Sequence, residues 1–155
     1  MSFIVRPMVA EDVPGVVAIE AGLASAPHWT AQAYEAAIAP EGGVLRFALV
    51  AENEGDLVGF LVASLVEAEA ELESVAVAES AQRQGVARML LAALIAKLQE
   101  KDAEEVVLEV RASNHPALAF YERAGFSAVG RRRNYYREPV EDALILRMSI
   151  GERRR

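Results

Sequence analysis

The sequence lacks cysteine altogether and has little histidine. Without cysteine the chain has no disulfide bond, no thiol nucleophile and no cysteine-ligated metal. The two histidines, His28 and His115, lie too far apart in the sequence to suggest a histidine-based metal site. We therefore expect no bound metal and no covalent intermediate on an enzyme thiol.

Long hydrophobic runs are missing as well. The longest apolar stretches are well short of a membrane span, and the first residues, Met1–Arg6, lack the apolar run of a signal peptide. Residues 1–155 suit one domain, and a hydrophobic content of 53% is high enough to fill a sizeable core. These features predict a cytoplasmic protein of a single domain, soluble as a monomer or weak dimer, with no membrane partner.

Positive charge is in the minority. The chain has 16 Lys and Arg residues against 23 Asp and Glu residues, which gives a formal net charge of −7. Phosphate contacts need clustered cations, so this balance disfavours direct binding of nucleic acid. It is compatible with a cationic substrate such as an amine or a basic peptide, although an acidic surface also serves solubility alone.

Periodicity and turn residues predict an α/β or α+β fold, with one mixed sheet and helices on both of its faces. Asp12 is the expected cap of the first helix, and Asn53-Glu54-Gly55-Asp56 is a turn that closes a hairpin. Pro40-Glu41-Gly42-Gly43 is expected to break the chain after the second helix. We expect strands at 3–8, 45–52, 57–66, 70–77, 105–110, 126–133 and 143–149, and helices at 10–23, 30–38, 86–101 and 116–124.

The polar segment Gln82–Arg88 joins a strand to the helix at 86–101. Free backbone N–H groups at a helix start attract anions, and Gly85 would let a phosphate approach the backbone closely. The segment has neither the Gly-Lys-Ser/Thr of a nucleotide P-loop nor the three spaced glycines of a dinucleotide fingerprint. It predicts either a pyrophosphate loop or an ordinary turn into an amphipathic helix.

Two side chains downstream of this loop could move protons. Glu109 lies inside the apolar strand Leu108-Glu109-Val110, where a buried and unpaired acid would cost several kcal/mol. It therefore faces either a cleft or solvent. Tyr121 lies on the next helix, where it could act as an acid or simply pack in the core. Asn114 lies between Glu109 and Tyr121, where its amide can cap that helix or bind a ligand.

These residues have the arrangement of a known family. The run Gln82-x-x-Gly85-x-Ala87 at a strand–helix junction resembles the acetyl-CoA motif of the GCN5-related N-acetyltransferases (GNAT superfamily). The run Asn114-x-x-Ala117-x-x-x-Tyr121-x-x-x-Gly125-Phe126 is similar to the next segment of that superfamily. The resemblance implies a mixed, mostly antiparallel sheet of about seven strands flanked by about four helices.

A narrower resemblance covers the chain from about Glu71 to Ile150. Leu108–Asn114, Arg132–Tyr136 and Glu141–Ala143 look like segments of the bacterial ribosomal-protein-alanine N-acetyltransferases, the RimI group. Pro27-His28-Trp29-Thr30 resembles the opening of that group's second helix, with His28 inserted. The resemblance implies acetylation of the N-terminal α-amine of a ribosomal protein, with acetyl-CoA as donor.

The resemblance also implies a role for each matching residue. Glu109 would be the general base and Tyr121 the general acid. Tyr135 and Tyr136 would lie near the acceptor peptide, unless they are ordinary strand aromatics. The cofactor contacts would comprise the backbone of Val75, Ala76 and Val77 at the acetyl and pantetheine end, Arg83, Gln84, Gly85, Val86, Ala87 and Arg88 around the pyrophosphate, and Asn114 on the cofactor arm.

The acceptor is the least determined part of this hypothesis. We expect a peptide with a free N-terminal alanine followed by a basic residue, with Glu141 and Asp142 as candidate acidic partners for that residue. A small-molecule amine or a lysine side chain is the first alternative. A non-catalytic acetyl-CoA sensor is the second, and it would need neither Glu109 nor Tyr121.

Overall fold

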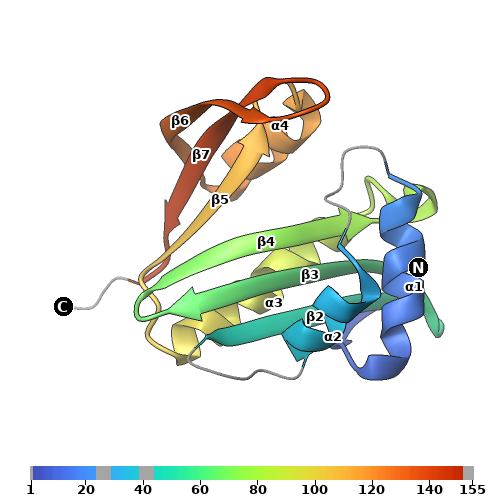
Figure 1. Ribbon diagram of the computed structural model, residues 1–155. Helices are drawn as coiled ribbons and strands as arrows, with labels where there is room; N and C mark the ends of the chain where they lie inside the picture. Colours follow the sequence, from blue (N-terminus) through green and yellow to red (C-terminus); the bar gives the residue numbers. More distant parts are fainter. Residues whose placement is uncertain (1, 24–28, 39–43, 152–155) are drawn as a thin grey trace.

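The computed structural model describes residues 2–23, 29–38 and 44–151. Its strands form one seven-stranded sheet in the order β1-β2-β3-β4-β5-β7-β6 (Figure 1). All neighbours are antiparallel except β4 and β5, which run parallel. The strands are β1 (Phe3–Pro7), β2 (Leu45–Asn53), β3 (Asp56–Val66), β4 (Glu69–Val77), β5 (Glu105–Arg111), β6 (Ser127–Tyr136) and β7 (Glu141–Ser149), and the helices are α1 (Val13–Ala21), α2 (Ala31–Ile38), α3 (Val86–Glu100) and α4 (His115–Ala124).

The predicted order of elements and the mostly antiparallel sheet are confirmed. Two short 3₁₀ turns, Ala10–Asp12 and Glu79–Ala81, were not predicted, and β6 continues past the predicted end at 133 to Tyr136. The predicted break at 40–43 and the inserted His28 lie outside the described residues. Among the helices that the structure describes, none is long and apolar enough to cross a membrane.

Two separate apolar clusters cover the two faces of the sheet. Residues of α1 and α2 pack with Val50, Phe60 and Val62 on one face. Residues of α3 and α4 pack with alternate residues of β2 to β5 on the other face. This alternation follows from the two-residue repeat of a strand, and it gives every side chain of the sheet a definite face.

Helix α3 begins at Gly85 and buries one broad stripe of side chains. Gly85 has a φ of 86°, in the left-handed region that favours glycine. The buried stripe comprises Val86, Leu90, Leu91, Leu94 and Leu98, at the three- and four-residue spacing of an amphipathic helix.

Helix α4 has a side-chain cap at one end and a glycine at the other. The Asn114 side chain accepts a hydrogen bond from Ala117 N at 3.3 Å, which satisfies one of the free N–H groups of the first turn. Gly125 follows the helix with a φ of 115°, the usual left-handed stop. The cap predicted for Asn114 is therefore confirmed.

Helices α1 and α2 are tied together by a buried carboxylate. The Oε2 atom of Glu20, on α1, accepts hydrogen bonds from Tyr34 Oη at 2.7 Å and from Trp29 N at 3.0 Å. Burial, followed by this contact, raises the pKa of Tyr34. Tyr34 also packs edge-on against Phe60 of β3, so this polar contact docks both helices on the sheet.

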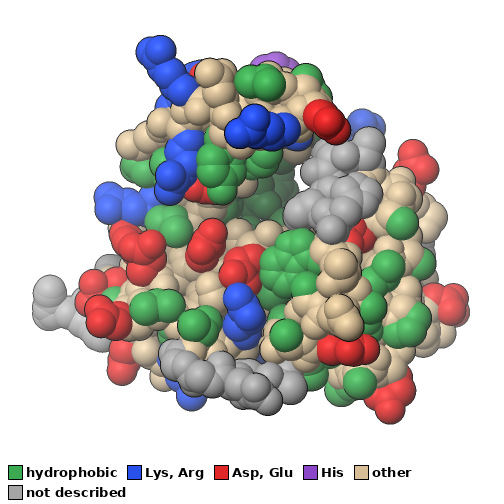
Figure 2. Space-filling view, viewed as in Figure 1, with side chains coloured by type: hydrophobic (Ala, Val, Ile, Leu, Met, Phe, Trp, Pro, Cys, Tyr) green, Lys and Arg blue, Asp and Glu red, His purple; other side chains and the backbone are tan. Residues whose placement is uncertain are grey.

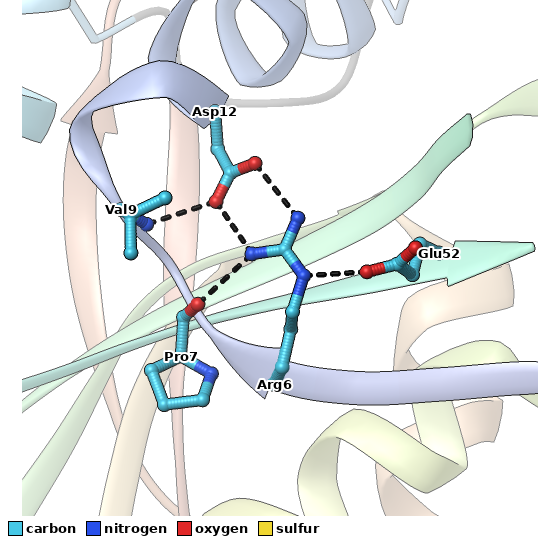
Figure 3. A network of polar contacts seen from close by, with 5 residues as sticks. All are labelled: Arg6, Pro7, Val9, Asp12 and Glu52. Carbon is cyan, nitrogen blue, oxygen red and sulfur yellow. Dashed lines mark hydrogen bonds and ion pairs between the residues drawn. The ribbon is translucent and has the colours of Figure 1, made fainter. Parts of the chain in front are cut away.

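A second polar network joins β1 to the start of α1 (Figure 3). Arg6 donates to both carboxylate oxygens of Asp12, at 2.8 and 2.9 Å, and to Glu52 on β2. Asp12 also accepts from Val9 N at 2.8 Å. The prediction that Asp12 caps the first helix is therefore wrong: its carboxylate turns back toward Arg6 and makes no cap bond to α1.

Strands β4 and β5 stay together over three residue pairs only, from Glu69 with Glu105 to Glu71 with Val107. A β-bulge follows at once in β4, because Val62 of β3 pairs with Ser74 and Ala63 pairs with Leu72. A bulge bends the strand that carries the extra residue. The sheet consequently opens into two arms, β1–β4 and β5–β7–β6 with α4 (Figure 1).

The Arg6–Asp12 contact gives a testable stability prediction. Arg6 lowers the pKa of Asp12 in the folded protein, so Asp12 stabilises the fold at every pH above its unfolded-state pKa of about 3.9 and loses that effect as the pH falls further. Asp12→Asn is expected to lower the free energy of unfolding by about 1.5–3 kcal/mol at pH 7. Urea titrations at several pH values should show wild type and variant converging below pH ~4. Glu11→Gln, an exposed neighbour with the same charge change, serves as the control; equal losses in both variants would contradict the prediction.

Candidate functional site

The candidate site is the cleft where β4 and β5 separate. Figure 2 shows the surface hollowed between the two arms of the sheet, with acidic side chains gathered on its near face. Among the described residues, none pairs with β4 on its β5 side beyond Glu71. The cleft therefore exposes strand backbone in the middle of the sheet.

The open edge of β4 is formed by alternate residues. Ala78 N donates a hydrogen bond to Val58 O on β3 at 2.7 Å. Because backbone groups alternate in direction along a strand, Ala76 also directs its N–H and carbonyl to β3. Val75 and Val77 direct theirs to the cleft. The carbonyl of Val77 accepts from Gln82 Nε2 at 3.0 Å. The N–H groups of Val75 and Val77 and the carbonyl of Val75 are left facing the cleft.

The loop from β4 to α3 leads directly out of this edge. Gln82 and Gln84 bind backward to Val77 O and Ser80 O, at 3.0 and 3.3 Å, which fixes the loop. Met89 N makes an i→i−4 bond to Gly85 O, so the N–H groups before it at the start of α3 lack such a partner. A Cβ added at Gly85 would meet nothing within 4 Å, so the space beside the loop is free.

Glu109 lies on the opposite side of the cleft, on β5. Its neighbours Leu108 and Val110 belong to the α3–α4 cluster, so Glu109 projects from the other face, the face of α1 and α2. Its Oε2 atom accepts from Arg132 Nε on β6, and its carboxylate lies beside the Tyr135 hydroxyl, whose pKa it raises. Of the two alternatives, the structure places Glu109 at the cleft.

Tyr121 approaches from the α4 side and is 8% exposed. Its ring packs edge-on against Phe120 and Phe126, so part of its role is core packing. Within the described chain its hydroxyl makes no hydrogen bond. Burial raises the pKa of Tyr121, which keeps the hydroxyl protonated at neutral pH.

Two further carboxylates line the near face of β4. Glu73, in the bulge, pairs with Arg46 of β2 at 3.2 Å. Glu71 has a raised pKa because of burial first and then the charges of Glu73, Glu109 and Glu69, with Arg132 opposing them. The negative charge of Glu71 is thus only partly balanced within the protein, and this face of the cleft favours a cation.

The acidic residues predicted to receive a basic side chain are engaged within the protein instead. Glu141 accepts from Arg111 Nη1 at 3.2 Å and from Ser113 N at 2.6 Å. Asp142 accepts from Asn134 N at 2.9 Å and from Arg131. These contacts lower the pKa of both carboxyl groups, through Ser113 foremost for Glu141 and Asn134 foremost for Asp142. Their charges are balanced, so the prediction is wrong about the partners of these two residues.

The end of β6 forms the outer wall of the site. The Tyr135 and Tyr136 rings meet edge-on with centroids 5.1 Å apart, and the Arg111 guanidinium lies 4.4 Å from the Tyr136 ring centroid. Arg111 also donates to the carbonyls of Arg137 and Pro139 in the β6–β7 turn. No role was predicted for Arg111 or Arg132, since no local pattern distinguishes them from other surface arginines.

A separate pocket of about 290 Å³ lies elsewhere on the molecule. Its walls come from β1, β2, α2 and the end of α3, and none of the predicted site residues lines it. The candidate site, in contrast, is an open groove along the edge of β4. Its backbone groups and the side chains just described are the groups that a ligand there could contact.

Known proteins share this arrangement. Residues 19–126 match the acetyltransferase (GNAT) family. A Bacillus subtilis (strain 168) protein, provisionally named as a [ribosomal protein bS18]-alanine N-acetyltransferase, is 34% identical over 96% of both chains. The solved ribosomal-protein-S18-alanine N-acetyltransferase of Escherichia coli superimposes with a TM-score of 0.84, at 30% identity over 99% of this chain and 97% of that one.

A third comparison is informative for the cleft. Naa20 of Chaetomium thermophilum, solved in complex with a bisubstrate analogue, has a TM-score of 0.83 and 27% identity, over 95% of this chain and 86% of that one. The family match spans most of this chain, and the whole fold superimposes on that of a solved N-acetyltransferase. The chain therefore belongs to the acetyltransferase (GNAT) family and is an N-acetyltransferase.

Proposed function

We propose that the protein transfers an acetyl group from acetyl-CoA to the N-terminal α-amine of a protein that begins with alanine, as the names of the Bacillus subtilis and Escherichia coli relatives describe for ribosomal protein bS18. One observation carries the proposal. The exposed edge of β4 lies between the N-terminus of α3 at Gly85 and the carboxylate of Glu109.

The described residues fit acetyl-CoA. The N–H groups at the start of α3 and the free space beside Gly85 suit its pyrophosphate, with Arg83, Gln84, Val86, Ala87 and Arg88 around it. The backbone of Val75 and Val77 suits the amide groups of its pantetheine arm, while Ala76 bonds to β3. Asn114 uses its oxygen to cap α4, which leaves its amide N–H groups for the same arm.

Bound acetyl-CoA supplies the acetyl group as a thioester. The incoming amine nitrogen first bonds to the acetyl carbon, which moves the carbonyl electron pair onto oxygen, and the carbon–sulfur bond then breaks as the carbonyl re-forms. Glu109 takes one proton from the amine, and Tyr121 gives one to the departing sulfur. The N–H groups at the edge of β4 stabilise the negative oxygen between these events. No enzyme nucleophile is needed, in keeping with the absence of cysteine.

The choice of acceptor follows from the cost of making a neutral amine. An α-amine with a pKa of about 7.7–8.0 costs about 1 kcal/mol to deprotonate at pH 7, whereas a lysine with a pKa of about 10.4 costs about 4.6 kcal/mol. A single carboxylate suffices for the first case. Glu71 and Glu109 on the near face favour an acceptor that carries further positive charge, such as a basic second residue.

Two alternatives remain testable. An acetyltransferase of small amines or of lysine side chains would use the same cleft with another acceptor. A non-catalytic acetyl-CoA sensor would need the Gly85 loop only. Glu109 on β5 and Tyr121 on α4 belong to the same arm of the sheet, and the presence of both a carboxylate and a phenol there supports a catalyst over the sensor.

The first prediction concerns the pyrophosphate loop. Acetyl-CoA at about 100 times its Kd should stabilise the protein by about 2.7 kcal/mol, or on the order of 5–10 °C in Tm. Gly85→Glu should abolish this shift because it adds bulk and negative charge to the loop. Gly55→Glu is the matched control, since Gly55 has a φ of 88° and equally open space. No shift for wild type at millimolar acetyl-CoA, or loss of the shift in Gly55→Glu, would reject the assignment.

The second prediction concerns proton transfer. Glu109→Gln should lower kcat by about 10²–10⁴-fold with little change in cofactor affinity. Glu105→Gln should leave kcat unchanged; Glu105 lies on the same face of β5 and pairs with Arg147 much as Glu109 pairs with Arg132. Tyr121→Phe should also lower kcat, by less for acetyl donors with better leaving groups. Stopped-flow or steady-state assays with wild-type rates in Glu109→Gln would disprove the role of the base.

The third prediction concerns the acceptor. We expect kcat/KM to be highest for a peptide that starts with Ala-Arg, lower for one that starts with Ala-Glu, and lowest for an N-terminally blocked peptide with an internal lysine. The preference for Arg over Glu should shrink as salt rises above about 0.15 M, because exposed charges are then screened within about 8 Å. If the blocked peptide or a free amine is acetylated tenfold better, the N-terminal assignment fails and only the family assignment stands.

A further inference from the structure

Glu109 does not lie free in the cleft, because an arginine from the far edge of the sheet reaches it. Arg132 Nε donates to Glu109 Oε2, and the Arg132 guanidinium lies 5.6 Å from the centroid of the Tyr135 ring. The side chains of Arg132 and Glu109 are 55% and 22% exposed. The cation therefore covers the carboxylate from the solvent side.

The contact spans an entire strand. β7 lies between β5 and β6, and Glu109 pairs with Ile145 whereas Arg132 pairs with Ala143, two residues along β7. The backbones of Glu109 and Arg132 are therefore about 12 Å apart, diagonally across the sheet. The short side chain of Ala143 leaves room for Arg132 to cross β7 beside Ile145.

The direction of Arg132 is set by an irregularity in β6. The register with β7 shifts between Arg132 and Tyr136, and Asn134 has a φ of 50°. Asp142 anchors this irregularity, since its two oxygens bind Asn134 N and Arg131. The anchored bend brings both Arg132 and Tyr135 toward Glu109.

A surface ion pair of this exposure contributes little to stability. Its consequence lies in geometry, because a carboxylate held from one side keeps its orientation while the remaining lone pairs stay available. Displacement of a reacting group by about 1 Å can cost about 10²-fold in rate. An arginine that fixes the base would therefore affect turnover more than folding.

We propose that Arg132 is a positioning residue that holds the Glu109 carboxylate in the orientation needed to accept the proton of the acceptor amine. The inference rests on the proposed function, because it requires Glu109 to be the base. Arg132 touches neither the acceptor nor the cofactor in this role. Asp142 acts indirectly, because its contacts with Asn134 N and Arg131 stabilise the bend of β6 that follows Arg132.

The test compares single and double variants with the Ala-Arg peptide. Arg132→Met keeps an unbranched stem beside Tyr135 but removes the charge and the donors. It should lower kcat by about 10- to 100-fold, change KM by less than about threefold, and leave Tm within about 2 °C of wild type. In a Glu109→Gln background, Arg132→Met should cause no further loss, because there is no base left to orient.

Arg133→Met is the matched control. Arg133 is the next residue on β6 and carries the same charge, but among the described residues it makes no hydrogen bond or ion pair with Glu109. The Arg133→Met variant should behave as wild type. If Arg132→Met fails to fold, Arg132→Gln replaces it. A rise in KM with kcat unchanged would show that Arg132 binds the acceptor, and equal losses with and without Glu109 would show an independent role. Either result overturns the inference. Failure of wild type to acetylate the peptide would instead overturn the proposed function.

Discussion

The separation of β4 from β5 is the constraint on which the rest of the site depends. Three residue pairs hold the two parallel strands together, and the bulge at Glu73 then turns β4 away. Backbone groups left open in the middle of a sheet are costly unless water or a ligand binds them. Water or a bound molecule therefore has to satisfy these groups, and the opening is a place where a substrate can do so. The opening also turns one sheet into two arms, each with its own helices.

Local sequence patterns predicted the elements but not this opening. The two ends of α4 could be predicted from Asn114 and Gly125, because a cap involves residues a few positions apart. The bulge at Glu73 involves the register of β3, which no short pattern in β4 reveals. The end of β6 was placed at 133, at the end of the run Arg131–Arg133, whereas the strand continues to Tyr136. An exposed edge strand carries such charged residues to discourage pairing with other chains.

The roles of charged residues were the hardest part to predict, because each depends on a partner far away in the sequence. Asp12 was predicted to cap a helix, but both of its carboxylate oxygens bind Arg6 instead. Glu141 and Asp142 were predicted to attract a substrate, yet Arg111 and Arg131 neutralise them. Glu109, in contrast, stood out in the sequence because it interrupts an apolar strand, although that position alone left a cleft and solvent as alternatives. A polar residue at a position that should be buried is informative in itself, whereas a polar residue on a polar segment is not.

In the proposed reaction, the acceptor and the donor enter the cleft from opposite faces of the sheet. Glu109 projects from the face of α1 and α2, where Glu71 and Glu73 also lie, whereas Tyr121 belongs to the face of α3 and α4, from which the Gly85 loop extends. An acceptor entering from the acidic face and a donor entering along α3 would meet only within the gap between β4 and β5. The base then takes its proton on one side of the sheet and the acid gives its proton on the other. Both substrates must be present together for this to occur. A sheet that remained closed between these strands could hold the same residues and still be unable to bring them to one reacting bond.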